Sequence, residues 1–303
     1  MSLVRIAASA AFCAICAAQA DAHAIVGDRA FPATLVIDDP GVADELALPT
    51  FTTMVNPDGS YQTDLAASWT KRITENLGVT ATATYSHLNP GGWGWQNLSS
   101  GLKYQAYTNP EHEFMASVAA DVEWGATGAA RLGAAPFTTI TPNVTFGKGF
   151  GDLPNELNWL RPGAFTGQFG VAIPTAAQSF APGLDSFAQN NPTFFDWGFS
   201  VQYSLPYLNA QVGAIDNEFL RKLIPLVEFA FQTPVANGWG QSTTGTINPG
   251  IIYSEQTWQF AVEAMIPVNS ASGRNVGVVA ELHFFLDDLF PQSIGKPLIP
   301  ANP

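Results

Sequence analysis

Of the four histidines in the sequence, His87, His112 and His283 lie beyond the first 24 residues and could take part in acid–base chemistry. His87 follows Ser86 directly, and a serine–histidine pair is the core of many acyl-transfer sites. No Gly-x-Ser-x-Gly, metal-spaced histidine cluster or phosphate-binding loop accompanies it. The sequence therefore predicts that the chain is not an enzyme and needs no cofactor. A lipid hydrolase that uses His87 is the weakest alternative.

A second set of chemically capable residues recurs at alternate positions of extended segments. The set comprises Asp64, Lys103, Glu113, Asp121, Glu123, Asp196, Glu228, Glu263, Glu281 and His283. Acidic members outnumber basic ones, and rings of carboxylates around a channel favour cations. We expect these side chains to line the interior of a barrel. The plainer interpretation is that they only fill and solvate a narrow interior.

The segment Val276–Leu286, "VGVVAELHFFL", shows how such residues are positioned. Every second residue from Val276 is apolar, and the intervening set includes Glu281 and His283. A strand places these two sets on opposite faces. One face is therefore apolar and the other partly wet, which raises the question whether the apolar face meets a core or lipid.

Period-two alternation of this kind recurs along the whole chain and predicts about twelve strands. We place them near 50–57, 60–72, 76–87, 96–107, 112–124, 139–150, 162–173, 193–205, 223–233, 246–254, 257–267 and 275–286. The sixth, seventh and tenth are the weakest because they contain glycines or a proline, which removes a ladder donor.

The strand and loop lengths favour a membrane barrel over a soluble sandwich. Strands of about ten residues match tilted outer-membrane strands, whereas soluble strands average about five or six. Connections on one side are long, near 88–95, 125–138, 174–192, 234–245 and 268–274. Most on the other side are short, but 151–161 and 206–222 break the rule and are expected to hold short helices. A soluble β-sandwich remains the competing fold.

Aromatic residues near strand ends support the same fold. Tyr61, Trp69, Tyr85, Trp124 and Trp258 lie on the apolar faces and are expected to form lipid-facing girdles at the membrane surfaces. The alternative is the general preference of Tyr and Trp for strands.

Composition excludes one class of partner. The net charge is −13, which argues against nucleic acid as a partner. Only 12% of residues are charged, about half the globular norm. No segment after the N-terminal stretch approaches 18 consecutive apolar residues, so no transmembrane helix is expected there.

The first 24 residues read as a secretory signal peptide. A positive charge at Arg5 precedes an apolar stretch, and Ala22-His23-Ala24 forms a small-x-small cleavage site. Both cysteines, Cys13 and Cys16, lie within it, so the mature chain should lack disulfides. We therefore expect export to the outer membrane of a Gram-negative bacterium.

The expected organisation is a signal peptide at 1–24, an N-terminal segment at 25–49, a barrel at 50–286 and a periplasmic tail at 287–303. The N-terminal segment is too polar and too interrupted by Pro32, Pro40 and Pro49 for a long helix. It is expected to be either a periplasmic strap or a plug in the lumen.

Several stretches resemble uncharacterised proteobacterial outer-membrane barrels. They are "FPATLVIDDPGVADELALP", "TFGKGFGDLP", "LIPLVEFAFQTP" and "LHFFLDDLFPQSIGKPL". The nearest named relatives by this resemblance are meta-pathway phenol-degradation transporters, which are similar to hydrocarbon channels. The resemblance slightly favours the plug. The 18 residues after Phe285 depart from the usual pattern, in which the chain ends on an aromatic residue.

The sequence thus predicts an all-β, transmembrane, antiparallel up-and-down barrel of about twelve strands. Its expected function is a channel or transporter, by passive diffusion, for small apolar or aromatic solutes. The expected partners are outer-membrane lipids, the solute and the barrel-assembly machinery. The alternative in another class is a structural or surface-interaction barrel without transport.

Overall fold

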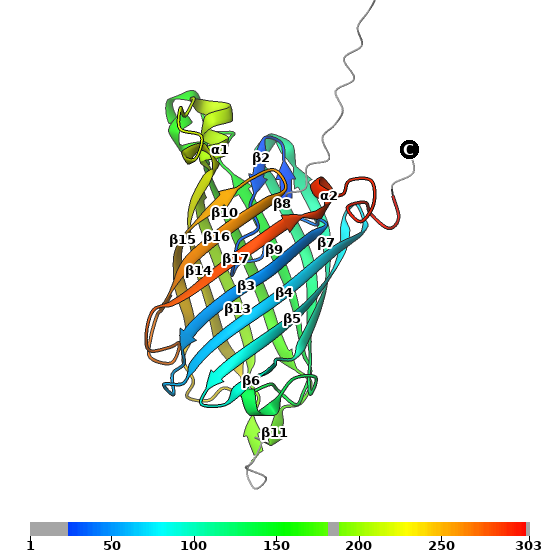
Figure 1. Ribbon diagram of the computed structural model, residues 1–303, viewed down its shortest axis with the longest axis vertical. Coiled ribbons are helices and arrows are strands. Elements are labelled where there is room, and N and C mark those ends of the chain that lie inside the picture. Colours follow the sequence, from blue (N-terminus) through cyan, green and yellow to red (C-terminus); the bar gives the residue numbers. More distant parts are fainter. Residues whose placement is uncertain (1–23, 181–187, 301–303) are drawn as a thin grey trace, which may run out of the picture.

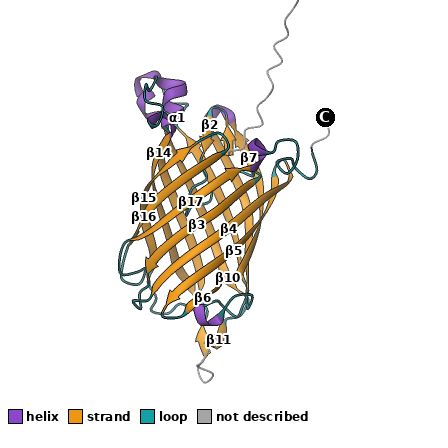
Figure 2. Cartoon of the chain, in the orientation of Figure 1, coloured by secondary structure: helices purple, strands orange, loops and turns teal. Residues whose placement is uncertain are grey.

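The computed structural model describes residues 24–180 and 188–300, and strands dominate it (Figures 1 and 2). The strands are β1 (Ala24–Val26), β2 (Arg29–Phe31), β3 (Glu45–Val55), β4 (Tyr61–Thr74), β5 (Leu77–Asn89), β6 (Gly92–Trp95), β7 (Leu98–Asn109), β8 (Phe114–Trp124), β9 (Thr139–Gly149), β10 (Gly163–Pro174), β11 (Gln178–Phe180), β12 (Ala188–Asn190), β13 (Thr193–Tyr203), β14 (Leu223–Ala236), β15 (Thr244–Ser254), β16 (Trp258–Pro267) and β17 (Gly277–Phe285). The helical turns are η1 (Pro110–His112), η2 (Ala130–Leu132), η3 (Asn155–Leu160), α1 (Leu205–Tyr207), η4 (Leu208–Val212), η5 (Leu220–Lys222) and α2 (Leu286–Leu289).

Twelve of the described strands form one closed antiparallel barrel. Their order is β4-β3-β17-β16-β15-β14-β13-β10-β9-β8-β7-β5, and the pairing of β4 with β5 closes the ring. Strand β6 adds to β5, while β1–β2 and β11–β12 form separate hairpins. Closure leaves no open sheet edge, and the predicted barrel fold is confirmed.

The alternation in the last strand places its two faces as expected. Val279, Glu281 and His283 are 3%, 8% and 6% exposed, so they point into the barrel. Val278, on the other face, is 39% exposed. The apolar set therefore lies on the outside of the barrel, where contact with water would be unfavourable.

Stacked aromatic rings reinforce the outer face of β9, β10, β13 and β14. Phe146 stacks on Phe169 with ring centroids 5.9 Å apart, and Phe165 stacks on Phe199 at 5.5 Å. Such cross-strand aromatic pairs stabilise a sheet beyond their buried area. Glycine at Gly167 leaves room for the Phe146 ring, because a Cβ there would lie 2.5 Å from it.

The expected girdle residues all belong to barrel strands. Tyr61, Trp69 and Trp124 are 46%, 47% and 48% exposed on the outer face. Tyr85 is half-buried, because its ring stacks on Trp93 of β6 at 5.4 Å. Trp258 is also half-buried, beside Tyr253.

Strand boundaries near proline differ from the sequence-based expectation. The first barrel strand begins at Glu45 rather than at 50, so the N-terminal segment is shorter than predicted. Pro49 is tolerated because the register shifts between Ala47 and Thr50, which leaves the proline out of the ladder. The three weaker segments are strands β9, β10 and β15.

The two ends of the barrel are unlike. We call the end where residues 24 and 300 lie the terminal end, and the opposite one the far end; the terminal end is at the top of Figure 1. The two long connections at the terminal end hold η3 and the group α1, η4 and η5, so their predicted helices are confirmed. No helix among the described residues is long and apolar enough to span a membrane.

The chain after the last strand folds back onto the terminal end. Leu298 and Ile299 donate backbone hydrogen bonds to the carbonyls of Arg72 and Ile73 on β4. Lys71 Nζ donates to the carbonyls of Ile294 (2.8 Å) and Lys296 (2.5 Å). The tail is therefore packed on β4. Residues 1–23 of the predicted signal peptide, with Cys13 and Cys16, lie outside the described residues, whereas Ala24 is the first residue of β1.

Candidate functional site

The N-terminal segment, residues 24–44, lies inside the terminal half of the barrel. Strands on different sides of the wall hold it. Lys103 of β7 donates to the carbonyl of Asp39 at 2.9 Å, Ser117 of β8 donates to the carbonyl of Pro40, and Gln259 of β16 donates to the carbonyl of Ala33. In Figure 1 this dark-blue stretch leads from β2 into the barrel before β3 begins.

Glu228 of β14 makes more hydrogen bonds to the segment than any of these residues. Its Oε2 accepts hydrogen bonds from the backbone N–H of Leu35 (3.1 Å) and Val36 (2.9 Å), and its Oε1 accepts one from Ile37 (2.8 Å). Glu228 is completely buried. Three convergent amides form a concave anion site, so the carboxylate clasps the segment as a backbone nest clasps a bound anion.

Two wall glycines make room for the segment. A Cβ at Gly198 of β13 would lie 2.3 Å from Ile37 Cδ1, and a Cβ at Gly147 of β9 would lie 2.8 Å from the ring of Phe31. Both glycines are therefore needed for close approach of the segment to the wall.

The β1–β2 hairpin is anchored by a buried ion pair. Arg29 Nε donates to Glu113 Oε2 at 3.2 Å, and the Tyr207 hydroxyl donates to Glu113 Oε1 at 2.9 Å. Burial and the adjacent carboxylate raise the pKa of Tyr207 to about 12. Glu113 was expected to line the lumen from a strand. It instead precedes β8, in the left-handed conformation that ends η1. The sequence alternation extended one residue too far, and Glu113 belongs to this anchor.

Lys103 lies where the segment crosses the middle of the barrel. Its Nζ forms an ion pair with Asp38 at 2.6 Å, in addition to its bond to the segment backbone. Burial raises the pKa of Asp39 to about 7, partly offset by the attraction of Lys103. The segment therefore carries a carboxyl group that titrates near neutral pH.

The expected residues of β17 form a compact cluster with β3. His283 Nδ1 lies 3.0 Å from Glu281 Oε1, and its Nε2 lies 3.6 Å from Glu45 Oε2. Thr50 donates to Glu281 Oε2 at 2.6 Å. This cluster lies beside the segment and joins the first and last barrel strands.

Glu263 lies against Glu228 rather than in an open lumen. A Cβ at Gly250 would lie 2.3 Å from Glu263 Cγ, so the side chain folds across Gly250 of β15. Glu263 is 1% exposed, and the neighbouring carboxyl of Glu228 is its side-chain partner. Asn248, opposite Glu228 in register, is likewise buried, and its side-chain amide has no hydrogen-bond partner among the described residues. These groups mark a polar patch behind the segment.

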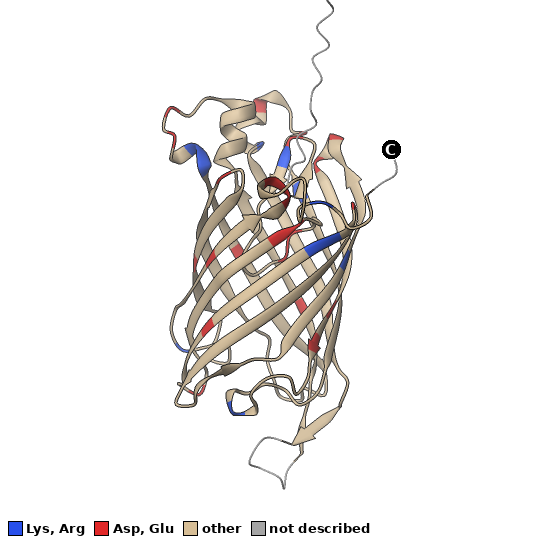
Figure 3. Ribbon diagram, turned by 45° about the vertical axis from the view of Figure 1, so that its right-hand side comes forward, with Lys and Arg blue, Asp and Glu red and all other residues tan. Residues whose placement is uncertain are grey.

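The remaining expected lumen residues lie in the far half. Asp64 accepts from Gln62 (3.0 Å), Asp121 accepts from Asn143 (2.6 Å) and Glu123 accepts from Asn97 (2.8 Å). Asp196 lies on β13 at a similar level, next to a cavity. Figure 3 shows acidic residues along the strands between the two ends. The structure thus separates the expected set into groups that hold the segment and groups that do not.

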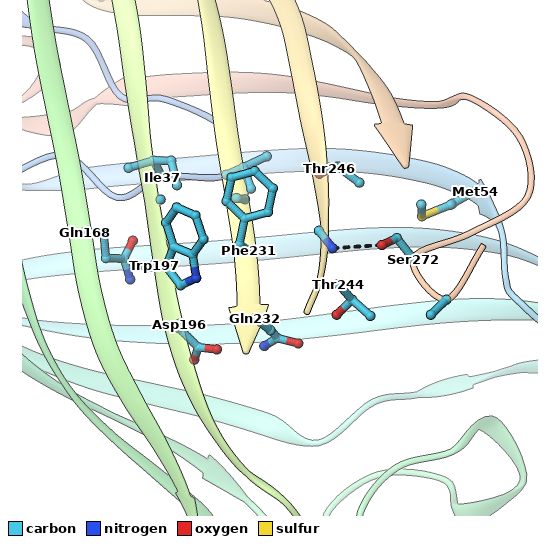
Figure 4. Close-up of a pocket in the computed structure, with 15 residues that line it drawn as sticks. Ile37, Met54, Gln168, Asp196, Trp197, Phe231, Gln232, Thr244, Thr246 and Ser272 are labelled. Carbon is cyan, nitrogen blue, oxygen red and sulfur yellow. Dashed lines mark hydrogen bonds between the residues drawn. The ribbon is translucent and has the colours of Figure 1, made fainter. Parts of the chain in front are cut away.

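A cavity of about 390 Å³ lies between the segment and the far end. Its inner boundary is Ile37, its wall includes Gln168, Asp196 and Gln232, and the 268–276 loop contributes Ser272 (Figure 4). Ser272 Oγ accepts a hydrogen bond from the backbone N–H of Gly245 at 2.9 Å, which ties the loop to β15. A solute in the far half would therefore meet the segment at Ile37.

The sequence-based prediction of the lumen lining contains only charged side chains and histidine, so it lacks the neutral polar residues of the site. The missed residues are Gln168, Gln232, Asn248 and Gln259, together with Arg29 and Asp38 on the N-terminal segment. The four amides lie in predicted strands at the same parity as the carboxylates, and that parity could have identified them. Nothing local in the sequence pairs Arg29 or Asp38 with a distant strand.

Ser86 and His87 do not form a catalytic pair. Ser86 is completely buried on the inner face of β5, whereas the His87 ring packs on Trp93 at 4.7 Å on the outer face. Consecutive strand residues point to opposite faces, so these two cannot converge. Among the described residues, no group of three or more His, Cys, Asp or Glu could hold a metal ion.

No protein-family model and no curated protein matches this chain. Solved structures do. An outer membrane channel from Pseudomonas putida F1 has a TM-score of 0.54 at 9% identity, covering 84% of this chain and 99% of that one. The NanC porin has a TM-score of 0.47 at 8% identity, covering 80% of this chain and 98% of that one. The KdgM porin has a TM-score of 0.46 at 10% identity, covering 78% of this chain and 97% of that one. At 9% identity, the likeness to the Pseudomonas putida channel shows a shared fold alone.

Proposed function

We propose that this chain is an outer-membrane channel through which small solutes diffuse passively. The observation that carries the proposal is the inside-out arrangement of the barrel. Apolar side chains cover the outside, carboxylates and amides face inward, and a cavity of about 390 Å³ leads from the far half to the N-terminal segment. A barrel in lipid needs an apolar outer surface. Closure of the barrel also lets every strand pair its backbone N–H and C=O groups with its neighbours, which lipid cannot do. The terminal end would face the periplasm.

The N-terminal segment acts as a plug whose displacement opens the channel. It lies within the terminal half of the lumen and is held by side-chain contacts rather than by strand pairing with the wall. A segment held mainly by a few polar contacts can leave without disrupting the barrel. Glu228, which bonds three of its amides, is the principal contact to break.

The resemblance to meta-pathway phenol-degradation transporters supports aromatic solutes as the cargo. The cavity lining combines apolar residues, among them Ile37, Met54 and Ala230, with polar ones, and so suits a ring that carries a polar group. Pockets of this size and mixed lining are typical of sites for small organic ligands.

A reversible crosslink between plug and wall tests the proposal. A Cβ at Gly78 of β5 would lie 2.8 Å from Val42 Cγ1. In a disulfide the corresponding Cβ-to-sulfur distance is about 3 Å, so the Val42→Cys/Gly78→Cys pair is close to bonding geometry. We expect oxidation to abolish conductance and solute flux in planar bilayers and liposomes, and dithiothreitol to restore both in the same preparation.

The two single-cysteine variants are the matched controls and should not respond to oxidant. Equal conductance of the oxidised and reduced double variant would show that the N-terminal segment does not gate. Absence of conductance in the wild type and in the reduced and Glu228→Ala proteins would favour a structural or surface-interaction barrel. Outer-membrane fractionation with a heat-dependent gel shift would establish whether the barrel is inserted.

A further inference from the structure

We propose that the cavity beyond the plug is a binding site for small amphipathic amines, with Asp196 as the residue that selects the ammonium group. The inference rests on the proposed function, because it names a solute class for the same lumen.

Among the described residues, the carboxylate of Asp196 has the neutral amide of Gln232 as its side-chain partner and no cationic one. Its Oδ1 is buried and without a hydrogen-bond partner among the described residues. Its register neighbours are Gly170 on β10 and Gln232 on β14, so no charged side chain flanks it in the sheet. No lysine, arginine or histidine is among the described residues that line the cavity. A ligand cation would supply the missing partner.

The polar groups around Asp196 also suit an ammonium group. Gln168 and Gln232 contribute amides, and Thr244 and Thr246 contribute hydroxyls to the same cavity (Figure 4). The Thr244 and Thr246 oxygens can accept N–H groups of a primary ammonium, which carries three donors. Gln168 Oε1 already accepts the backbone N–H of Asp38 at 3.1 Å. An anionic ligand would find a carboxylate and no cation there, and a like charge would oppose its binding.

The apolar lining of the cavity determines which ligand body fits. Ile37 on the plug, Met54 on β3 and Ala230 on β14 provide apolar contact. A volume of about 390 Å³ falls within the range of sites that bind small organic ligands. A single ring or a short alkyl chain with a terminal amine meets both requirements.

The rest of the far half favours the same sign of charge. Asp64 and Glu123 point into the lumen in the far half, and each accepts a hydrogen bond from a neutral amide. Asp121 lies closer to the plug, in a second cavity that Lys103 also lines, and Lys103 is paired with Asp38. The carboxylates of Asp64 and Glu123 therefore attract cations toward Asp196.

The test compares three ligands with one skeleton: phenethylamine, 2-phenylethanol and phenylacetate. Binding to the detergent-solubilised full chain is measured by calorimetry at about pH 7, where the amine is a cation and the acid an anion. We expect the amine to bind about tenfold more tightly than the alcohol, as one charge-assisted bond implies, and the acid to bind more weakly than either.

Substitution then locates the preference. Asp196→Asn should lower amine affinity about tenfold, to that of the alcohol, and leave alcohol affinity unchanged. Asp64→Asn removes a carboxylate of the same half that does not line the cavity, and it should leave the amine preference intact. Equal affinities for amine and alcohol in the wild type, or an amine preference that survives Asp196→Asn, would overturn the inference.

Conductance separates this inference from the channel proposal. Amine binding that depends on Asp196 in a protein without conductance would leave the site standing and remove the channel. Plug-dependent conductance without an amine preference would leave the channel standing and remove the site.

Discussion

Replacing Glu228 with alanine should release the plug while leaving the barrel closed. The change removes the acceptor of three amide hydrogen bonds, at 3.1, 2.9 and 2.8 Å. Bonds to a charged group contribute about 1.5–3 kcal/mol each. We use the lower value because such contributions are not fully additive, and three bonds then give roughly 4–5 kcal/mol. At about 1.4 kcal/mol per tenfold, the ratio of docked to released plug should fall about a thousandfold.

The plug's position can be followed through a single cysteine. Val42 on the plug is 9% exposed and packs toward Gly78, so a Val42→Cys thiol is protected while the plug is docked. In the Glu228→Ala background its labelling by a charged maleimide should accelerate by at least about a hundredfold, and the open fraction in single-channel records should rise. Glu228→Gln keeps one acceptor oxygen and should lie between the two proteins.

Asp64→Asn is the control, because Asp64 faces the same lumen and accepts hydrogen bonds from Gln62 rather than from the plug. Its labelling rate and open fraction should equal those of the wild type. An unchanged labelling rate and open fraction in Glu228→Ala, with a barrel that still shows the heat-dependent gel shift, would refute the assignment of Glu228 as the clasp.

Three further predictions concern the plug's charge, its hairpin and the membrane face. Burial raises the pKa of Asp39 from 3.8 to about 7, so the protonated form is favoured when docked. Docking is strongest at low pH, weakens between about pH 4 and pH 7, and changes little above that. The open fraction should therefore rise between about pH 4 and pH 7 and then level off, and Asp39→Asn should flatten this profile; an unchanged profile would contradict it. Arg29→Met leaves Glu113 buried without its cation and should destabilise docking of the hairpin by about 3–5 kcal/mol, measured by maleimide protection. Adding Glu113→Gln should recover part of this loss. No recovery would count against a buried ion pair. Phe169→Arg on the outer face of β10 should lower the unfolding free energy in lipid vesicles by about 2–4 kcal/mol, whereas Gln168→Arg, facing inward, should cost much less; equal losses would argue against a lipid-facing outer surface.

The barrel could be predicted from sequence because each strand carries its own period-two pattern. In β17 the residues at 279, 281 and 283 face inward and those at 278 and 282 face outward, as their alternation requires. This information is local, since a one-residue slip would expose the charges to the outer face. Local pattern also placed Asp64, Asp121 and Asp196 on the inner face.

Boundaries and caps were less predictable. Pro49 suggested that the first strand begins late, but a register shift absorbs it and the strand begins at Glu45. Glu113 continued the alternation of β8, yet it belongs to the preceding turn, where Arg29 and Tyr207 bind it. Both differences come from contacts with residues distant in the chain.

Sequence alone determined a closed, antiparallel barrel with apolar side chains outside and charges inside. Tertiary structure alone decided what those charges do. It brought Glu228 to the amides of residues 35–37, across 191 or more positions of sequence, and left Asp196 at the edge of a cavity without a cation. Alternation is a property of each strand, so it can be read along the chain. The contacts of the plug depend on which strands surround it after closure, and no single segment encodes that.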